Sequence, residues 1–166
     1  MIAMMSAALL AGAAAQVPPI SPTAIVTPIG AKMPTPGEAF AEGKPLLTPE
    51  QAIFAAADAG PRRGVRGVFE MPVQRAEAVG RRFFLNSQRD YRDQRNLSVA
   101  IAPSALRALR ERFGDNLSDA FLGRTVRVSG RAERVRIDFV SHGRRTGQYY
   151  YQTHVTVFDP RQIEID

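Results

Sequence analysis

The sequence predicts a mainly β domain, a five-stranded Greek-key barrel with one helix between its third and fourth strands and a short N-terminal helix. Three observations lead to this fold class. Short strand-like runs recur from residue 65 onward, and one amphipathic helical run interrupts them after the third. The chain has 166 residues and no cysteine. Packing of an ordinary core, without disulfides or thiolate-bound zinc, must therefore hold the domain together.

The first fifteen residues have the composition of a signal peptide. They are uncharged, rich in Ala, Leu and Met, and end in Ala13-Ala14-Ala15, where small residues suit cleavage after Ala15. The run is shorter than the roughly 20 apolar residues of a membrane-spanning helix. We expect a secreted or periplasmic protein with no stable membrane span after processing. A disordered Ala-rich tail and an uncleaved anchor are the alternatives.

Residues 16–47 are expected to form a Pro-rich flexible arm. Eight of the twelve prolines lie between Pro18 and Pro49, which disfavours both helix and central strand. A short helix should follow within residues 48–60, from Pro49 to Ala59, because Thr48 and Gln51 have the spacing of a capping box and Gly60-Pro61 ends the run. Its apolar face would consist of Ala52, Ile53, Ala56 and Ala57.

The barrel domain is expected over residues 61–166. Strand-like runs predict five strands and a short terminal edge, at 65–73, 82–88, 97–102, 125–140, 148–158 and 162–165. Between the third and fourth strands, Leu106, Leu109 and Phe113 share one helical face, with Ser104 as a candidate cap and Gly114 as a left-handed end.

The fourth strand is long, and the parity of its apolar residues shifts along it. Val126 and Val128 are even, whereas Val135 and Ile137 are odd, which predicts a β-bulge near Ser129-Gly130. Residues 141–147 contain two glycines and two arginines and are expected to form the tip of a hairpin.

Three segments carry a resemblance at the residue level: 82–101, 123–130 and 155–163. Together with the strand order, they resemble the oligonucleotide/oligosaccharide-binding (OB) fold superfamily over about residues 64–166. The resemblance implies a ligand face on the second and third strands, flanked by the loops at 76–81 and 141–147. It does not imply a particular ligand, since this fold serves many functions.

Basic charge is confined to the predicted barrel. All twenty arginines lie between Arg62 and Arg161, so residues 61–166 carry a formal charge of +8, whereas residues 1–60 carry −2. A basic domain suggests an anionic partner. A genome rich in G and C would also favour Arg over Lys, although it does not explain the excess over acid.

Strand parity selects the candidate ligand-binding residues. If Phe83 and Leu85 face inward, then Arg82, Phe84 and Asn86 face outward and offer an aromatic beside a cation, as stacking on bases requires. By the same parity Tyr149 and Tyr151 face inward, and Tyr150 and His154 outward. The full candidate set is Arg82, Phe84, Asn86, Tyr91, Arg127, Arg144, Arg145 and Tyr150.

The residues give little support to catalysis, and neither catalytic residues, a cofactor nor a metal site is expected. The two histidines, His142 and His154, lack a nucleophile motif. No glycine-rich segment lies between a strand and a helix, where a phosphate-binding loop belongs. Four aspartates in two pairs are better explained as turn and cap residues than as metal ligands: Asp90, Asp93, Asp115 and Asp119.

The sequence therefore favours an exported, non-enzymatic binding module whose basic face engages single-stranded nucleic acid or an anionic envelope polysaccharide. A protein-interaction or scaffolding module that docks an envelope protein is the main alternative. A metal-dependent hydrolase is the third reading. The ligand and the oligomeric state stay open.

Overall fold

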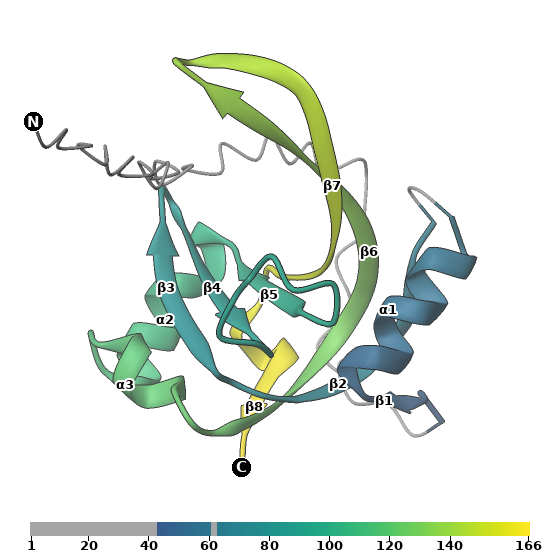
Figure 1. The fold of residues 1–166 in the computed structure, drawn as a ribbon. Coiled ribbons are helices and arrows are strands. Elements are labelled where there is room, and N and C mark those ends of the chain that lie inside the picture. The colour runs from purple at the N-terminus through teal and green to yellow at the C-terminus, as the bar shows by residue number, and fades with distance from the viewer. Residues whose placement is uncertain (1–42, 61–62) are drawn as a thin grey trace, which may run out of the picture.

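The computed structural model describes residues 43–60 and 63–166, which form one strongly curled sheet with helices around it (Figure 1). The domain is mainly β, as the sequence predicts. The expected signal peptide and residues 16–42 of the expected Pro-rich arm lie outside the described residues.

The described residues form eight strands and four helical segments, joined by loops and turns. The strands are β1 (Leu46–Leu47), β2 (Val65–Pro72), β3 (Arg75–Val79), β4 (Arg82–Asn86), β5 (Leu97–Ile101), β6 (Thr125–Ser141), β7 (Arg144–Val157) and β8 (Ile163–Ile165). The helices are α1 (Pro49–Asp58), α2 (Pro103–Phe113), α3 (Leu117–Phe121) and the 3₁₀ turn η1 (Pro160–Gln162).

The strands follow the order β1-β2-β6-β7-β5-β4-β3, and β8 pairs with β6. β1 runs parallel to β2 and β5 runs parallel to β7, while the other pairs are antiparallel. β3 is the last strand of this path and β2 lies next to its other end, beside the two-residue β1, although only Val73 and Gln74 separate β2 from β3 in the chain. The Val73 amide donates to the Arg124 carbonyl at 2.8 Å and the Gln74 amide to the Asn86 carbonyl at 2.9 Å. The junction therefore links both ends of the curled sheet.

The expected number of five strands is wrong. Six of the eight strands match the expected runs: β2, β4, β5, β6 and β7, with β8 as the terminal edge. β3 was expected to be part of a loop, since Arg75–Val79 has little apolar character, yet it pairs with β4 over its whole length. β1 has two residues and continues the sheet beyond β2, so Leu46–Leu47 belong to the folded domain rather than to the arm.

The bulge expected near Ser129-Gly130 is also wrong. β6 pairs with β2 without interruption through Ser129 and Gly130. The glycine at position 130 instead leaves space for the side chain of Val155, since a Cβ at this position would lie 2.8 Å from Cγ1 of Val155. The register irregularity lies between Asp138 and Val140, where β6 pairs with β7.

α1 begins as the sequence predicts. The Gln51 amide donates to Oγ1 of Thr48 at 3.3 Å, and the Thr48 amide donates to Oε1 of Gln51 at 3.0 Å, which completes the capping box. Ala52 and Ala56 are fully buried in the core. These two small side chains let the helix backbone lie close to the strands.

α2 matches the expected helix, but its start does not. Ala102 is the N-cap and offers no side-chain hydrogen bond. Ser104 lies inside the helix, where its hydroxyl donates to the Phe158 carbonyl at 2.9 Å. Gly114 ends the helix at a positive φ of 92°, with an extended ψ of 168° rather than a left-handed one.

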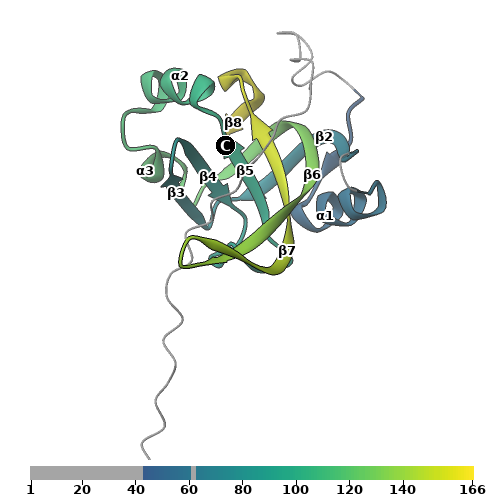
Figure 2. The same cartoon turned by 90° about the horizontal axis from the view of Figure 1, so that it is seen from above.

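The helices lie on two sides of the sheet. In both views α1 is on one side, and α2 with α3 is on the other (Figure 2). Side chains from both groups meet the strands in one core, which includes Ala56, Phe69, Leu85, Leu109, Phe121 and Val155. None of the helices in the described part of the chain has the length and apolar content needed to cross a bilayer.

β6 and β7 continue past the rest of the sheet as a two-stranded ribbon (Figure 1). We call residues 133–152 the hairpin extension, because here the two strands have no other partner strand. Its turn is tighter than the expected tip at 141–147 and consists of His142 and Gly143, both with positive φ. Residues 144–147 are part of β7 instead.

Candidate ligand-binding site

The outer side of β4 presents Phe84, as its alternation with Phe83 and Leu85 predicts. Phe83 and Leu85 are buried in the core, at 6% and 0% exposure. Phe84 is half-buried, and its ring meets the His154 ring edge-on at 6.1 Å. Because β5 separates β4 from β7, this contact spans three strands of the sheet.

Arg82 starts the same strand and is half-buried. Its Nη1 is buried and has no hydrogen-bond partner among the described residues. A guanidinium N–H without an acceptor retains its full capacity to bind an oxygen. Arg82 therefore stays a candidate contact for an anion.

Asn86 does not project into solvent, contrary to the expectation. It is 2% exposed, and its Oδ1 accepts hydrogen bonds from Oγ of Ser98 at 2.7 Å and from Nδ2 of Asn96 at 3.1 Å. Nδ2 of Asn96 also donates to the Tyr91 carbonyl at 3.2 Å. Asn86 thus anchors the loop between β4 and β5, which covers it.

His154 is buried in this layer as well, at 5% exposure, although it was expected to face outward into solvent. Its Nε2 lies 2.8 Å from Oε1 of Gln152, which can only accept, so Nε2 carries the proton of the neutral ring. Burial, and secondarily the charge of Arg82, lowers the pKa of His154 to about 4. The ring is therefore neutral at physiological pH.

Gln152 brings Tyr91 and Tyr150 together. Its Nε2 donates to the Tyr91 carbonyl at 2.9 Å and to the Tyr150 hydroxyl at 3.0 Å. Burial raises the pKa of Tyr150 to about 12. The guanidinium carbons of Arg75 and Arg92 lie 5.5 and 5.2 Å from the centroid of the Tyr91 ring. Hydrogen bonding to Tyr91 raises the pKa of Arg92 above its ordinary value.

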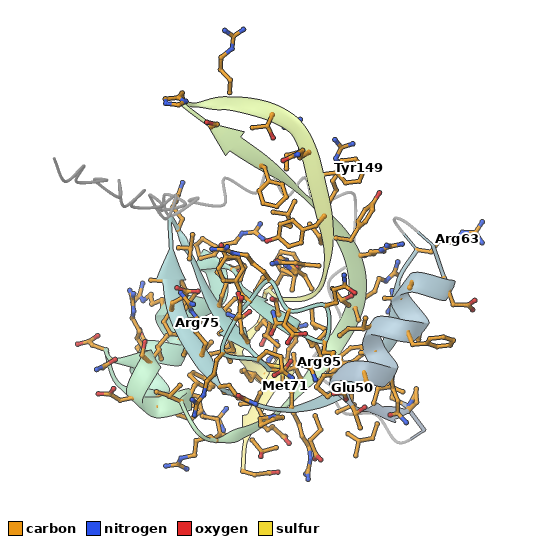
Figure 3. All side chains as sticks on the ribbon, viewed as in Figure 1. Glu50, Arg63, Met71, Arg75, Arg95 and Tyr149 are labelled. Atoms are coloured by element: carbon orange, nitrogen blue, oxygen red, sulfur yellow. The ribbon has the colours of Figure 1, made fainter. Side chains whose placement is uncertain are left out.

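The hairpin extension carries a ladder of arginines on tyrosines. Arg134 lies over the Tyr151 ring with its Cζ 4.1 Å from the centroid, and Arg136 lies over Tyr149 at 4.0 Å. The two tyrosine rings meet edge-to-face at 5.7 Å. We call Arg134, Arg136, Tyr149 and Tyr151 the Arg–Tyr ladder. Figure 3 shows Tyr149 on the extension, above the barrel.

The expectation that Tyr149 and Tyr151 are core residues is wrong. They share the parity of buried Val155, but they are 49% and 39% exposed. The reason is that the extension runs past the rest of the sheet. The side of β7 that faces the core near Val155 is therefore not covered at Tyr149 and Tyr151. Parity sets the side of a strand and not its burial.

A pocket of about 430 Å³ opens beside the ladder. α1 supplies Ile53 and Ala57 to it, the loop before β5 supplies Arg92 and three neighbours, and the rest of the wall comes from the extension and Thr153. The full lining is Ile53, Ala57, Arg92, Asp93, Gln94, Asn96, Arg134, Phe139, Tyr150, Tyr151, Gln152 and Thr153. Of the expected binding residues, only Tyr150 lines it.

Three expected binding arginines lie away from this pocket. Arg127 forms ion pairs with Glu70 at 2.7 Å and Asp166 at 3.3 Å, so it ties β6 to β2 and the C-terminal residues. Arg144 and Arg145 begin β7 beside the turn and are exposed. Arg145 lies 3.4 Å from Asp138, which also pairs with Arg136 at 2.8 Å.

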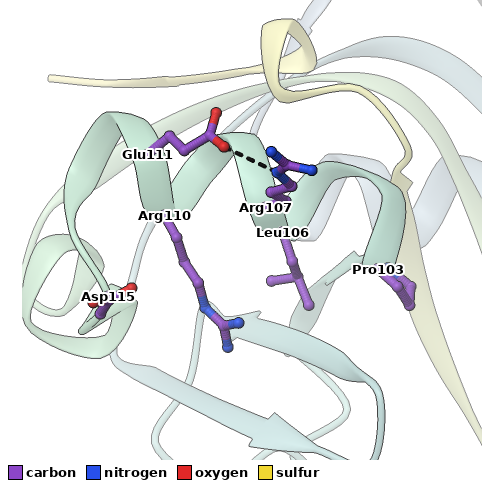
Figure 4. A pocket seen from close by; sticks show the side chains of 6 residues that line it. All are labelled: Pro103, Leu106, Arg107, Arg110, Glu111 and Asp115. Carbon is purple, nitrogen blue, oxygen red and sulfur yellow. Dashed lines mark hydrogen bonds and ion pairs between the residues drawn. The ribbon is translucent and has the colours of Figure 1, made fainter.

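A second hollow, of about 420 Å³, lies along α2 (Figure 4). Arg107, Arg110 and Glu111 line it together with Pro103, Leu106 and Asp115. Arg107 pairs with Glu111 at 3.0 Å, four residues along the helix. This hollow lacks aromatic residues, which makes it the weaker candidate for stacking.

Three of the four aspartates considered as metal ligands stabilise loops or a helix start instead. Asp90 accepts from the Arg92 amide at 3.0 Å, Asp93 holds Arg95, and Asp119 accepts from Asn116. Within residues 43–60 and 63–166, no three His, Cys, Asp or Glu side chains gather as metal ligands would.

The candidate set predicted from the sequence contains none of the four residues of the Arg–Tyr ladder, and it also misses the pocket residues Arg92 and Phe139. A signal for the ladder was present. A turn at His142-Gly143 brings the arginines of the Arg-Val-Arg run at 134–136 near the tyrosines at 149–151. In the structure Arg136 pairs with Tyr151 and Arg134 pairs with Thr153, so each arginine lies diagonally across from the tyrosine that it covers. The tip of seven residues that we expected at 141–147 does not define this pairing, because it assigns residues 144–147 to the turn rather than to β7.

Comparison with known protein families finds no family whose pattern matches this chain, and no curated protein is significantly similar to it. The candidate site therefore stands on its own geometry.

Proposed function

We propose that this protein is a binding module that holds single-stranded nucleic acid along the hairpin extension. The observation that carries the proposal is the exposed Arg–Tyr ladder. Guanidinium planes and tyrosine rings stack with nucleobases of any sequence, at roughly 1–3 kcal/mol per base. The ladder sits on a ribbon that leaves it accessible.

Charge on the extension supports a polyanion. Residues 133–152 contain four arginines and two acids. One of those acids, Asp138, is shared by Arg136 and Arg145, and the structure gives Arg134 and Arg144 no carboxylate partner among the described residues. Each phosphate that such a cation neutralises releases a counterion, which favours binding at low salt.

The proposal includes an OB-type barrel. β2 and β3 would be two halves of one bent first strand, which leaves five main strands plus the short edge strands β1 and β8. Three features support this reading: α2 follows β5, β5 pairs in parallel with β7, and the two halves of the first strand border β6 and β4. The hairpin extension would then be the loop between the fourth and fifth strands.

The proposal also retains export to the periplasm or outside the cell, from the composition of residues 1–15. An exported module meets both released nucleic acid and anionic polysaccharides. The exposed tyrosine and guanidinium surfaces of the ladder favour nucleic acid, because they can stack with bases. Polysaccharide is the alternative that the experiment separates.

The test is a fluorescence-anisotropy titration of labelled decathymidylate at about 20 and 200 mM salt. We expect binding at low salt that weakens by at least about 10-fold at high salt. The double variant Tyr149→Ala/Tyr151→Ala should weaken it by a further 10-fold or more. Arg107→Gln, which removes an exposed charge on α2, is the matched control and should bind within about 2-fold of the wild type.

Absence of binding at low salt, or wild-type affinity in the double variant, would overturn the proposal. If an acidic polysaccharide such as alginate binds more tightly than decathymidylate, and the double variant loses that binding, the ligand of the ladder would be a polysaccharide instead.

A protein-interaction module is the second candidate, and one observation favours it. Phe54 on α1 is 77% exposed and Leu46 is 55% exposed, so both leave apolar surface that a partner protein could cover. This reading predicts capture of a defined envelope protein that Phe54→Ser abolishes and Tyr149→Ala leaves unchanged.

A further inference from the structure

The pocket between α1, the loop before β5 and the hairpin extension has the size of a ligand site. Its volume of about 430 Å³ lies within the range of roughly 300–1,000 Å³ that small-molecule sites occupy. Three separate parts of the chain form its wall: α1, the loop before β5 and the hairpin extension. The ladder meets it at Arg134 and Tyr151, which belong to both.

Positive charge is in excess in the lining of this pocket. Arg92 and Arg134 both line it, and neither forms an ion pair with a described carboxylate; each is held by a tyrosine ring. Asp93 is the one carboxylate in the lining. It is occupied by Arg95, with contacts of 3.1 and 2.8 Å, and that hydrogen bonding lowers the pKa of Asp93 to about 2. An anion entering the pocket would thus meet two arginines and an already paired aspartate.

The remaining wall suits a flat ring. Phe139 and Tyr150 lie with ring centroids 5.3 Å apart and a tilt of 39°, and Ile53 adds an aliphatic surface from α1. Gln94 and Thr153 supply polar groups. A flat heterocycle with polar edges and an attached anion matches this combination, and a nucleotide is such a group.

We propose that the pocket binds the terminal nucleotide of the strand held on the ladder, with its terminal phosphate on Arg92 and Arg134 and its base against Phe139 and Tyr150. The inference rests on the proposed function. α1 and the 92–96 loop wall the pocket, so the polymer ends there rather than passing through. The protein would therefore recognise phosphorylated ends of single strands.

The experiment compares three decathymidylates, with a 5′-phosphate, with a 3′-phosphate and with hydroxyl groups at both ends, by isothermal titration calorimetry. We expect one of the phosphorylated strands to bind the wild type about 10-fold more tightly than the hydroxyl-ended strand. Thymidine monophosphate should also bind weakly, and thymidine should not.

Two variants locate this preference. Ala57→Leu narrows the pocket from the α1 side, and Arg92→Gln removes one of its cations without touching the ladder. Each should reduce the preference for the phosphorylated end to less than about 2-fold, because affinity for the phosphorylated strand should fall much more than affinity for the hydroxyl-ended strand. Ala55→Leu, on the same helix but outside the pocket lining, is the matched control and should keep the preference.

The outcomes separate the two proposals. Equal binding of all three strands by the wild type overturns the terminal site and leaves the ladder intact. A preference that persists in both pocket variants also overturns it. Binding of the monophosphate without binding of any strand supports the pocket and refutes the ladder.

Discussion

His154 shows how an outward-pointing residue becomes part of the protein interior. It occupies the face of β7 opposite the core, yet it is 5% exposed and has Gln152 and Phe84 as neighbours. Burial disfavours the charged ring and lowers its pKa to about 4, from an ordinary value of 6.5. The neutral ring is therefore part of the stable structure, and protonation opposes folding.

The stability of the protein should consequently fall in mild acid. Between pH 6.5 and pH 4 the unfolded chain binds a proton at this histidine that the folded protein does not, so the contribution of His154 is complete above pH 6.5 and decreases as the pH falls. At pH 4.5 the loss should be about 2 kcal/mol relative to pH 7.5. Urea unfolding at both pH values measures it.

The variant His154→Gln isolates this contribution. It cannot ionise, so its unfolding free energy should decrease less than that of the wild type over the same pH interval. An equal decrease in both proteins would show that His154 does not govern the acid response over this interval.

At the residue scale, alternation predicted sides correctly and exposure poorly. Phe83 and Leu85 face the core as expected. Asn86 and Tyr149 have the opposite exposure from that expected, for two different reasons. A loop folds back over Asn86, and the strand that carries Tyr149 continues beyond the sheet. Both effects come from distant segments, which local periodicity does not report.

The hairpin extension depends on a two-residue turn. His142 and Gly143 have φ angles of 51° and 74°. Two successive positive φ values match the right-handed twist of a hairpin, and glycine accepts such a value without strain. Gly143 is thus the residue that lets β6 reverse directly into β7.

Gly143→Ala should loosen the extension without unfolding the barrel. The added methyl group strains the turn by about 1 kcal/mol, and residues 133–152 pair only with each other. Hydrogen exchange at amides near the turn should therefore accelerate about 5-fold, while the melting temperature stays within a degree or two. Binding of decathymidylate would weaken in parallel if the ladder acts as proposed.

A large drop in melting temperature would contradict this separation. It would mean that the extension and the barrel unfold as one unit. His142→Asn provides the opposite comparison, since asparagine adopts positive φ more readily than most residues, and it should slow exchange at the same amides.

At the element scale, long or strongly patterned segments were predictable. The capping box of α1 and the apolar alternation of β2 identify those elements directly. The missed elements are short or weakly apolar: β1 has two residues, α3 has five, and β3 has the composition Arg-Ala-Glu-Ala-Val. Pairing with β4 makes β3 a strand, and that partner is not readable from β3 itself.

One buried amide ties the C-terminal segment to the whole barrel. Gln162 is 3% exposed, and its Nε2 donates to the Ser129 carbonyl at 2.9 Å. Its Oε1 accepts from the Phe158 and Asp159 amides at 2.9 and 3.0 Å. The side chain thereby connects β6, the end of β7 and the turn before β8.

Gln162→Leu should destabilise the entire domain. It leaves buried backbone groups without partners, which costs about 3 kcal/mol in unfolding free energy. Urea denaturation followed by circular dichroism measures the change. Arg161→Gln, an exposed change in the same turn, should have little effect, and an equal loss in both variants would refute the role of the buried amide.

At the scale of the molecule, the confinement of arginine to residues 62–161 was visible in the sequence, but its arrangement was not. Several arginines, such as Arg127, are used in ion pairs between strands. Others, such as Arg134, lie on aromatic rings. Cross-strand register decides whether an arginine forms an ion pair or lies on an aromatic ring, so net charge alone does not locate the site.

The junction at Val73 and Gln74 also governs the order in which this protein can fold. Apart from the two residues of β1, β2 pairs only with β6. Val65 can therefore form its strand pair only after Ala132 has been synthesised. β4 and β5 lie close together in sequence and can meet early, whereas β2 stays an open edge until most of the chain has left the ribosome. Such distant pairing slows folding and prolongs the exposure of apolar strands. A chain shortened before residue 132 would therefore be prone to aggregate.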